Sequence, residues 1–331
     1  MKRTLNILMT TLLILTGCQD KPSLDPVPGP SETYPIQFGI SADLEVESKT
    51  VIDDSNFETN KFTALGNLTV DGEQQTDLFG ENGVTVENIS NVWTYSPLRY
   101  WQTGSYVFAG VMPSAAGTAS FSANNELTIN FGTEGFDLSA TQHDLMVAFT
   151  PKEVEKVSAT DVLLNFEHQL SLVVINGAYK ETAGKVRVDK IEVFGNTAKT
   201  AGNMVFTHDK TKTKINASYS LDSQSVTDVD NVYQTIEGAW ELAPSSTSTN
   251  IVSGLLVFPE ECDFSIVVTY TDRYGNKDGV QKTKSAALHS NWEPGKKYTY
   301  TFNVNLDHIS FAEPTVTDWV SGGNVDTGIE M

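Results

Sequence analysis

The chain has 331 residues, which is enough for about two domains of ordinary size. Its 42 acidic residues outnumber the 22 basic ones and give a formal net charge of −20, which disfavours binding to a nucleic-acid backbone. Hydrophobic residues make up 39% of the chain and charged residues 19%, a globular composition that excludes a disordered chain. Two cysteines and five scattered histidines favour neither a disulfide framework nor a zinc module.

The N-terminus has the pattern of a bacterial lipoprotein signal peptide. Lys2 and Arg3 precede an apolar run that ends at Leu15 and is shorter than the roughly 20 residues of a membrane-spanning helix. Leu15-Thr16-Gly17-Cys18 then matches the lipobox, in which cleavage after Gly17 leaves an acylated Cys18 as the new N-terminus. We therefore predict a lipoprotein signal peptide over residues 1–17. The alternative is a plain signal peptide followed by a coincidental cysteine.

A proline-rich segment follows the lipobox. Four prolines between Pro22 and Pro30 predict a flexible, extended tether over residues 18–31. Several acyl chains on Cys18 would hold the protein on a membrane, because a single chain anchors only marginally. Gln19 follows the cysteine in place of Asp, which argues against retention at the inner membrane. We expect a surface-exposed lipoprotein of the cell outer membrane.

Beyond the tether, short alternations of apolar and polar residues predict β-strands separated by turns. The clearest is the last one, where Tyr298, Tyr300 and Phe302 alternate with polar residues. In chain order the predicted strands are Tyr34–Ile40, Tyr106–Val111, Leu127–Phe131, Leu145–Phe149, Val162–Phe166, Leu170–Ile175, Val186–Phe194, Leu255–Phe258, Phe264–Tyr270 and Tyr298–Leu306. No stretch after residue 20 keeps a helical period for three turns. The pattern predicts an all-β fold of antiparallel sandwiches.

A domain boundary is predicted near Gly177–Gly184, where Asn-Gly and Ala-Gly pairs interrupt two strong strands. It divides the chain into an N-terminal sandwich over residues 32–180 and a C-terminal sandwich over residues 181–331. Each part then has about 150 residues, which is close to the most common domain size.

The sequence lacks the motifs of the common enzyme classes. There is no Gly-x-Ser-x-Gly, no His-Glu-x-x-His and no phosphate-binding glycine loop. Asp228 and Asp230 lack the glycine of a calcium loop, so we interpret them as part of a solvated turn. Cys262 stands between Glu261 and Asp263, whose charges make it a poor thiolate. We expect no enzymatic activity, no cofactor, no metal site and no nucleic-acid partner.

Several blocks, in order, resemble the fimbrillin-like (Mfa-like) family, which comprises surface lipoprotein subunits of fimbriae in Gram-negative anaerobes. The blocks are Arg99-Tyr100-Trp101 with the strand Tyr106–Ala109, Gln142–Ala148, Val162–Ser171, Leu255–Pro259, Trp292–Tyr300 and Asp318-Trp319. Each block is weak by itself, but their order and spacing extend over nearly the whole chain after the tether.

The resemblance implies two tandem transthyretin-like β-sandwich domains and a role as a structural or adhesive pilus subunit. In the family, a protease removes the N-terminal strand of one subunit, and the C-terminal strand of a neighbour fills the exposed groove. An open sheet edge over an apolar groove favours such strand addition. Here Tyr34–Ile40 would be the removable strand and Ile309–Val320 the donor, with Phe311, Val316 and Trp319 as anchors. The alternative keeps that C-terminal strand in its own domain.

The sequence departs from the family at the cleavage site. Well-studied subunits are cut after an arginine, yet none lies between Cys18 and Arg99, and Lys49 is the nearest substitute. Either another protease acts, or the protein stays lipidated as an anchor, a tip or a non-polymerised adhesin. The implied partners are other fimbrial subunits, the outer membrane through Cys18, and host or bacterial surface ligands.

One other function is compatible with the lipid anchor and the aromatic content, namely a glycan-binding surface lipoprotein. Exposed tryptophans stack on sugars, but we expect Trp101, Trp292 and Trp319 to lie in the core. His168 is expected to be a structural, hydrogen-bonded histidine at a strand position and not a catalytic base.

Overall fold

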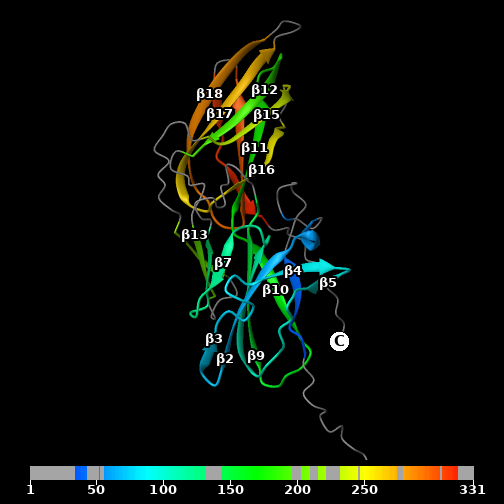
Figure 1. The fold of residues 1–331 in the computed structure, drawn as a ribbon. Helices are drawn as coiled ribbons and strands as arrows, with labels where there is room; N and C mark the ends of the chain where they lie inside the picture. Colours follow the sequence, from blue (N-terminus) through cyan, green and yellow to red (C-terminus); the bar gives the residue numbers. More distant parts are fainter. Residues whose placement is uncertain are drawn as a thin grey trace, which may run out of the picture. The chain divides into compact units, whose positions relative to one another are not determined.

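The computed structural model describes residues 34–42, 52, 56–130, 143–195, 203–208, 215–220, 232–244, 247–273, 279–305 and 308–319. These residues belong to one compact unit that is built almost wholly of β-strands (Figure 1). The single helical element among them is the 3-10 turn η1 (Phe57–Thr59). No helix in the described ranges is long and apolar enough to cross a membrane. The predicted all-β class is confirmed.

The first sheet contains all the strands before residue 170 except β7 (Thr118–Phe121) and β8 (Glu126–Asn130). It has eight strands in the order β1-β10-β9-β6-β2-β4-β5, with β3 paired to β2. Its strands are β1 (Gln37–Ala42), β2 (Phe62–Val70), β3 (Glu73–Gln75), β4 (Val84–Ile89), β5 (Val92–Thr94), β6 (Gly104–Met112), β9 (Met146–Val154) and β10 (Asp161–His168).

This sheet folds around its own core. The backbone of β10 pairs with β9 only at Glu167 and His168, although Thr150 Oγ1 of β9 also donates a hydrogen bond to the Leu163 carbonyl of β10. A Cβ atom on Gly110 of β6 would lie 2.8 Å from the ring of Phe166 of β10, which places the two strands face to face. The cluster between them is rich in aromatic side chains and includes Phe62 and Phe108.

Two further sheets are built from strands that lie after residue 170. One has the order β16-β11-β19-β20, with β21 also paired to β19, and the other has the order β15-β12-β17-β18. Their buried faces share one core cluster, in which Phe302 of the first sheet and Val268 of the second both lie. The strands are β11 (Ser171–Tyr179), β16 (Thr249–Val257), β19 (Lys296–Val304), β20 (Ile309–Phe311), β21 (Thr315–Asp318), β12 (Lys185–Phe194), β15 (Val232–Leu242), β17 (Glu261–Arg273) and β18 (Val280–Asn291).

A fourth sheet joins strands from both sides of the predicted domain boundary. Its order is β14-β13-β8-β7, from β7 (Thr118–Phe121), β8 (Glu126–Asn130), β13 (Asn203–His208) and β14 (Ile215–Ser220). Backbone pairing of β8 with β13 therefore links residues before 180 to residues after 181. The boundary itself falls in the turn between β11 and β12. The division into two domains stays a prediction.

The sequence predicted antiparallel sheets, but two of the strand pairs are parallel. Strand β1 pairs in parallel with β10, and β11 pairs in parallel with β19. Both pairs join strands that are more than 100 residues apart in sequence, so there is ample chain for the long crossover that parallel pairing requires.

Candidate strand-exchange site

The predicted removable strand lies between two partners. Strand β1 is the end strand of the first sheet and pairs with β10 from Gln37↔Asp161 to Ala42↔Phe166. On its other side, the Ile36 backbone N–H donates a hydrogen bond of 2.8 Å to the Arg99 carbonyl, and the Trp101 N–H donates one of 2.9 Å to the Tyr34 carbonyl. The segment thus closes a seam between β10 and residues 99–101.

Two side chains of this segment fill the core below the seam. Ile36 is fully buried and Phe38 is 5% exposed. The Phe38 ring lies 5.7 Å from the rings of Phe62, Phe79 and Tyr95 and 6.2 Å from that of Phe108. Burial of each of the two side chains contributes about 1.5–3 kcal/mol. Removal of β1 would therefore uncover an apolar, aromatic-lined groove.

The opposite face of β1 is small and polar. A Cβ atom on Gly39 would lie 2.8 Å from Cδ2 of its register partner Leu163, whose side chain is 68% exposed. Ser41 Oγ donates a hydrogen bond of 3.2 Å to Asn165 Oδ1 on β10. A strand in this position thus needs large apolar residues on one face only.

The predicted donor segment lies on its own domain in this structure. Both β20 and β21 pair with β19, and Lys296 of β19 forms an ion pair with Asp318 of β21. Phe311 packs on Phe302 with ring centroids 5.8 Å apart, whereas Val316 is 49% exposed. The placement matches the alternative given for the C-terminal strand. Val320 lies outside the described residues.

Trp319 anchors the end of this segment. Its side chain is 1% exposed, and its backbone N–H donates a hydrogen bond of 2.8 Å to the Gly295 carbonyl. The indole ring stacks on the imidazole ring of His168, with centroids 4.1 Å apart and an interplanar angle of 11°. Release of the C-terminal segment would thus require the indole to leave a buried position.

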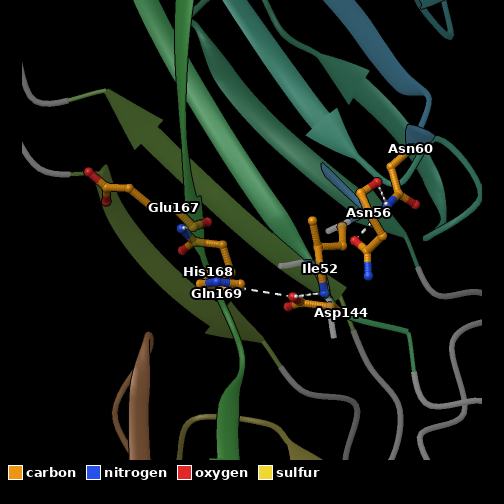
Figure 2. Close-up of polar contacts among 7 residues, drawn as sticks. All are labelled: Ile52, Asn56, Asn60, Asp144, Glu167, His168 and Gln169. Carbon is orange, nitrogen blue, oxygen red and sulfur yellow. Dashed lines mark hydrogen bonds and ion pairs between the residues drawn. The ribbon is translucent and has the colours of Figure 1, made fainter. Parts of the chain in front are cut away.

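His168 belongs to a buried polar cluster at the junction of β10 and β11, shown in Figure 2. Its Nδ1 lies 2.9 Å from Asp144 Oδ2, and both side chains are almost fully buried. The same carboxylate oxygen accepts a hydrogen bond of 3.0 Å from the Ile52 backbone N–H. Asp144 therefore connects the chain that follows β1 to the histidine under Trp319. His168 is the last residue of β10, which agrees with the predicted strand position.

Some of the other predicted site residues are buried, and the rest lie outside the described residues. Cys262 is buried at the start of β17, and burial together with the charges of Glu260 and Asp263 raises the pKa of its thiol. Trp101 and Trp292 lie in the core at 4% and 3% exposure, so with Trp319 they offer no flat platform to a sugar. Gly17, Cys18 and Lys49 lie outside the described residues, as do Asp228 and Asp230.

Sequence reasoning missed Asp144 as part of this site, whereas Ile36 lies within the predicted removable strand Tyr34–Ile40. Asp144 stands directly before the apolar run of β9, and a lone acidic residue there gives no sign that it is buried. Its partners lie 24 and 92 residues away, so the contact depends on the tertiary structure alone.

The fold and the seam define a class of protein, namely a multi-sheet β-sandwich protein in which terminal strands complete the core. Within that class, the sequence profile of the fimbrillin-like family matches residues 49–319. The chain therefore belongs to the fimbrillin-like family, as its sequence blocks predicted. It is a structural subunit of a cell-surface fimbrium and associates with other fimbrial subunits.

Solved structures agree with this fold. A fimbrial protein from Bacteroides vulgatus has 15% identity and a TM-score of 0.57, over 86% of this chain and 99% of that one. A candidate cell adhesion protein from Bacteroides ovatus has 10% identity and a TM-score of 0.50, over 88% and 100% of the two chains. A comparison with curated protein sequences finds no match for this chain.

Proposed function

We propose that this protein is an outer-membrane lipoprotein, acylated at Cys18, that joins other pilus subunits by β-strand exchange. The observation that carries the proposal is the position of β1. The Ile36–Phe38 segment supplies two large buried side chains, yet it lies at the end of the chain's first sheet. A strand that arrives from another subunit can replace both its backbone pairing with β10 and its side-chain burial.

The C-terminal segment repeats the side-chain pattern of the segment it would replace. Ile36-Gln37-Phe38-Gly39 corresponds residue by residue to Ile309-Ser310-Phe311-Ala312. In a parallel register like that of β1, Ile309 and Phe311 would enter the groove. Ala312 would replace Gly39 beside Leu163, and its Cβ atom would require the end of that exposed leucine side chain to shift.

Release of the donor segment has a moderate cost. Strand β20 has three residues and β21 has four, and all four residues of β21 are exposed. The main loss is the burial of Trp319, which the new burial of Ile309 and Phe311 in a neighbour would offset in part.

Proteolysis at Lys49 would free β1 for exchange. Strand β1 ends at Ala42, and the Ile52 backbone, which follows Lys49 in sequence, is held by the Asp144 carboxylate. A cut after Lys49 would leave that second attachment on the subunit. N-terminal sequencing of the protein from the cell surface tests this step: Thr50 as the first residue indicates maturation, and an acylated Cys18 indicates a retained anchor.

Disulfide trapping tests the proposed register. Leu163→Cys combined with Ala312→Cys should link successive subunits into covalent ladders in the cells that produce the protein, because paired strands bring the two Cα atoms within disulfide range. The matched control combines Leu163→Cys with Val316→Cys, four residues out of register, and should give no ladder.

The results of these experiments distinguish a wrong register from a failure of the strand-exchange proposal. Ladders in the control and not in the test pair would show that another register is used. If deletion of residues 309–331 leaves the non-covalent oligomers unchanged, the C-terminal segment is not the donor and the exchange proposal fails.

A further inference from the structure

The backbone that borders the start of the seam carries exposed apolar side chains. Tyr100 forms a β-bridge with Pro35, directly before the Ile36–Phe38 segment that fills the groove. Its side chain is 44% exposed, and that of Leu98 is 45% exposed. The next residue, Trp101, is buried in the core below. Leu98 and Tyr100 thus form an apolar rim on the outer surface, which we call the entrance rim.

The chain between β19 and the proposed donor segment is short. Strand β19 ends at Val304 and the donor begins at Ile309, five positions later. An extended chain spans at most about 3.3–3.6 Å per residue, so the two Cα atoms lie no more than roughly 18 Å apart. In the proposed register, Ile309 of one subunit occupies the position of Ile36 in the next, where the backbone N–H donates to the Arg99 carbonyl. Strand exchange therefore holds the end of the neighbour's β19 close to the entrance rim.

The same end of the neighbour's sheets exposes an apolar side chain of its own. Val304 pairs with Tyr179 at the end of β11, and a short turn leads from there to the start of β12. Val186 of β12 pairs with Asp272 of β17, which pairs with Val280 at the start of β18. The Val280 side chain is 69% exposed, the largest fraction for a large hydrophobic residue in the described ranges. Val304 and Val280 therefore lie at the same end of the two sheets.

We propose that the entrance rim binds this Val280 end in a second copy of the chain. The inference rests on the proposed strand exchange, because the donor segment is the tether that brings the two surfaces together. A short tether gives the second contact a high effective concentration, so a small apolar contact suffices to strengthen the joint. The net charge of −20 makes two copies repel each other, which favours an apolar contact between them over a charged one.

Chemical cross-linking in the cells that produce the protein tests the contact. Tyr100→Cys combined with Val280→Cys should give ladders of subunits with a short bismaleimide, because the contact brings the two thiols together. The matched control combines Ile89→Cys with Val280→Cys and should give no ladder. Ile89 is 53% exposed and belongs to the same sheet, but it lies at the turn of the β4–β5 hairpin and not beside Pro35.

A second measurement compares the stability of the assembled oligomers. Leu98→Asp and Val280→Asp should each lower at least tenfold the amount of oligomer that survives gentle warming of cell extracts. Ile89→Asp introduces the same charge at an equally exposed position and should leave that amount unchanged. Because all three side chains are exposed, the melting temperatures of the purified chains should match that of the parent chain.

The results distinguish a wrong contact from a failure of strand exchange. If the Leu163→Cys and Ala312→Cys pair gives ladders but the Tyr100→Cys and Val280→Cys pair gives none, strand exchange stands and the rim contact is wrong. Oligomers of Leu98→Asp and Val280→Asp as abundant as those of the parent chain would also overturn the contact. If neither pair gives ladders and deletion of residues 309–331 leaves the oligomers unchanged, strand exchange fails and this inference fails with it.

Discussion

The imidazole ring of His168 lies flat on the indole ring of Trp319, with ring centroids 4.1 Å apart. The histidine ends β10, the partner strand of β1, and the tryptophan follows the last described strand. Because Asp144 also holds the Ile52 backbone, one buried cluster contacts the C-terminal segment through Trp319 and the chain that follows β1 through Ile52. The cluster thus holds the C-terminal segment on its own subunit.

Trp319→Ala should release the C-terminal segment. Loss of a fully buried indole should lower the free energy of unfolding by about 3–5 kcal/mol. Hydrogen exchange should also become faster in β20 and β21, which few backbone pairs hold in place. Val316→Ala, at an exposed position of the same segment, is the control and should change neither measurement. Unaltered exchange in the Trp319 variant would contradict the anchor role.

Asp144→Ala should destabilise the subunit by about 1–3 kcal/mol in urea unfolding, because the buried Ile52 N–H loses its acceptor. Asp161→Ala, at the exposed start of β10, is the control. Its free energy of unfolding should lie within about 0.5 kcal/mol of that of the parent chain. Equal stabilities of the two variants would show that the buried carboxylate does not stabilise the junction.

The carboxylate of Asp189 on β12 should contribute to the loss of folding stability at low pH. Burial raises the pKa of its carboxyl group, but hydrogen bonds from Thr271 and Arg187 outweigh this effect and lower the pKa below its ordinary value. A lowered pKa in the folded state stabilises the protein above the ordinary aspartate pKa, and the contribution is lost as the pH falls through the lowered value. Asp189→Asn should therefore flatten the decline of melting temperature below about pH 4. A decline as steep as that of the parent chain would exclude this contribution.

The pairing of β8 with β13 should couple the two sides of the predicted domain boundary. Calorimetry of the parent chain should show one unfolding transition, because backbone hydrogen bonds and a shared core cross residues 180–181. Val205→Pro removes a backbone donor from the middle of β13 and should split or broaden that transition. Val205→Ala keeps the donor and serves as the control; identical scans for both variants would argue against the coupling.

The Cys262 thiol should react slowly with disulfide reagents at pH 8 in the folded chain carrying Cys18→Ser. Burial and the neighbouring carboxylates raise its pKa, so little thiolate is present, and the sulfur is shielded as well. Addition of urea should speed the reaction to the rate of a free thiol. Rapid labelling without urea would show that the start of β17 opens.

Strands with alternating sequences were predicted well, and two other kinds were missed. β19 and β10 each have one face in a core and the other toward solvent, so their alternation is visible in the sequence. β2 is buried on nearly its whole length, between two core clusters, and shows no alternation. β18 is an edge strand rich in polar residues, and only its twelve-residue pairing with β17 makes it a strand.

The amino-acid sequence by itself determined the all-β class and the family, because alternation and ordered motifs are local properties. Only the tertiary structure decided that Ile36 and Phe38 complete an aromatic core, that Trp319 is buried against His168 of its own subunit, and that Asp144 lies beside both Ile52 and His168. Those contacts join residues up to about a hundred and fifty positions apart. Their energies depend on burial and distance, which the folded chain alone establishes.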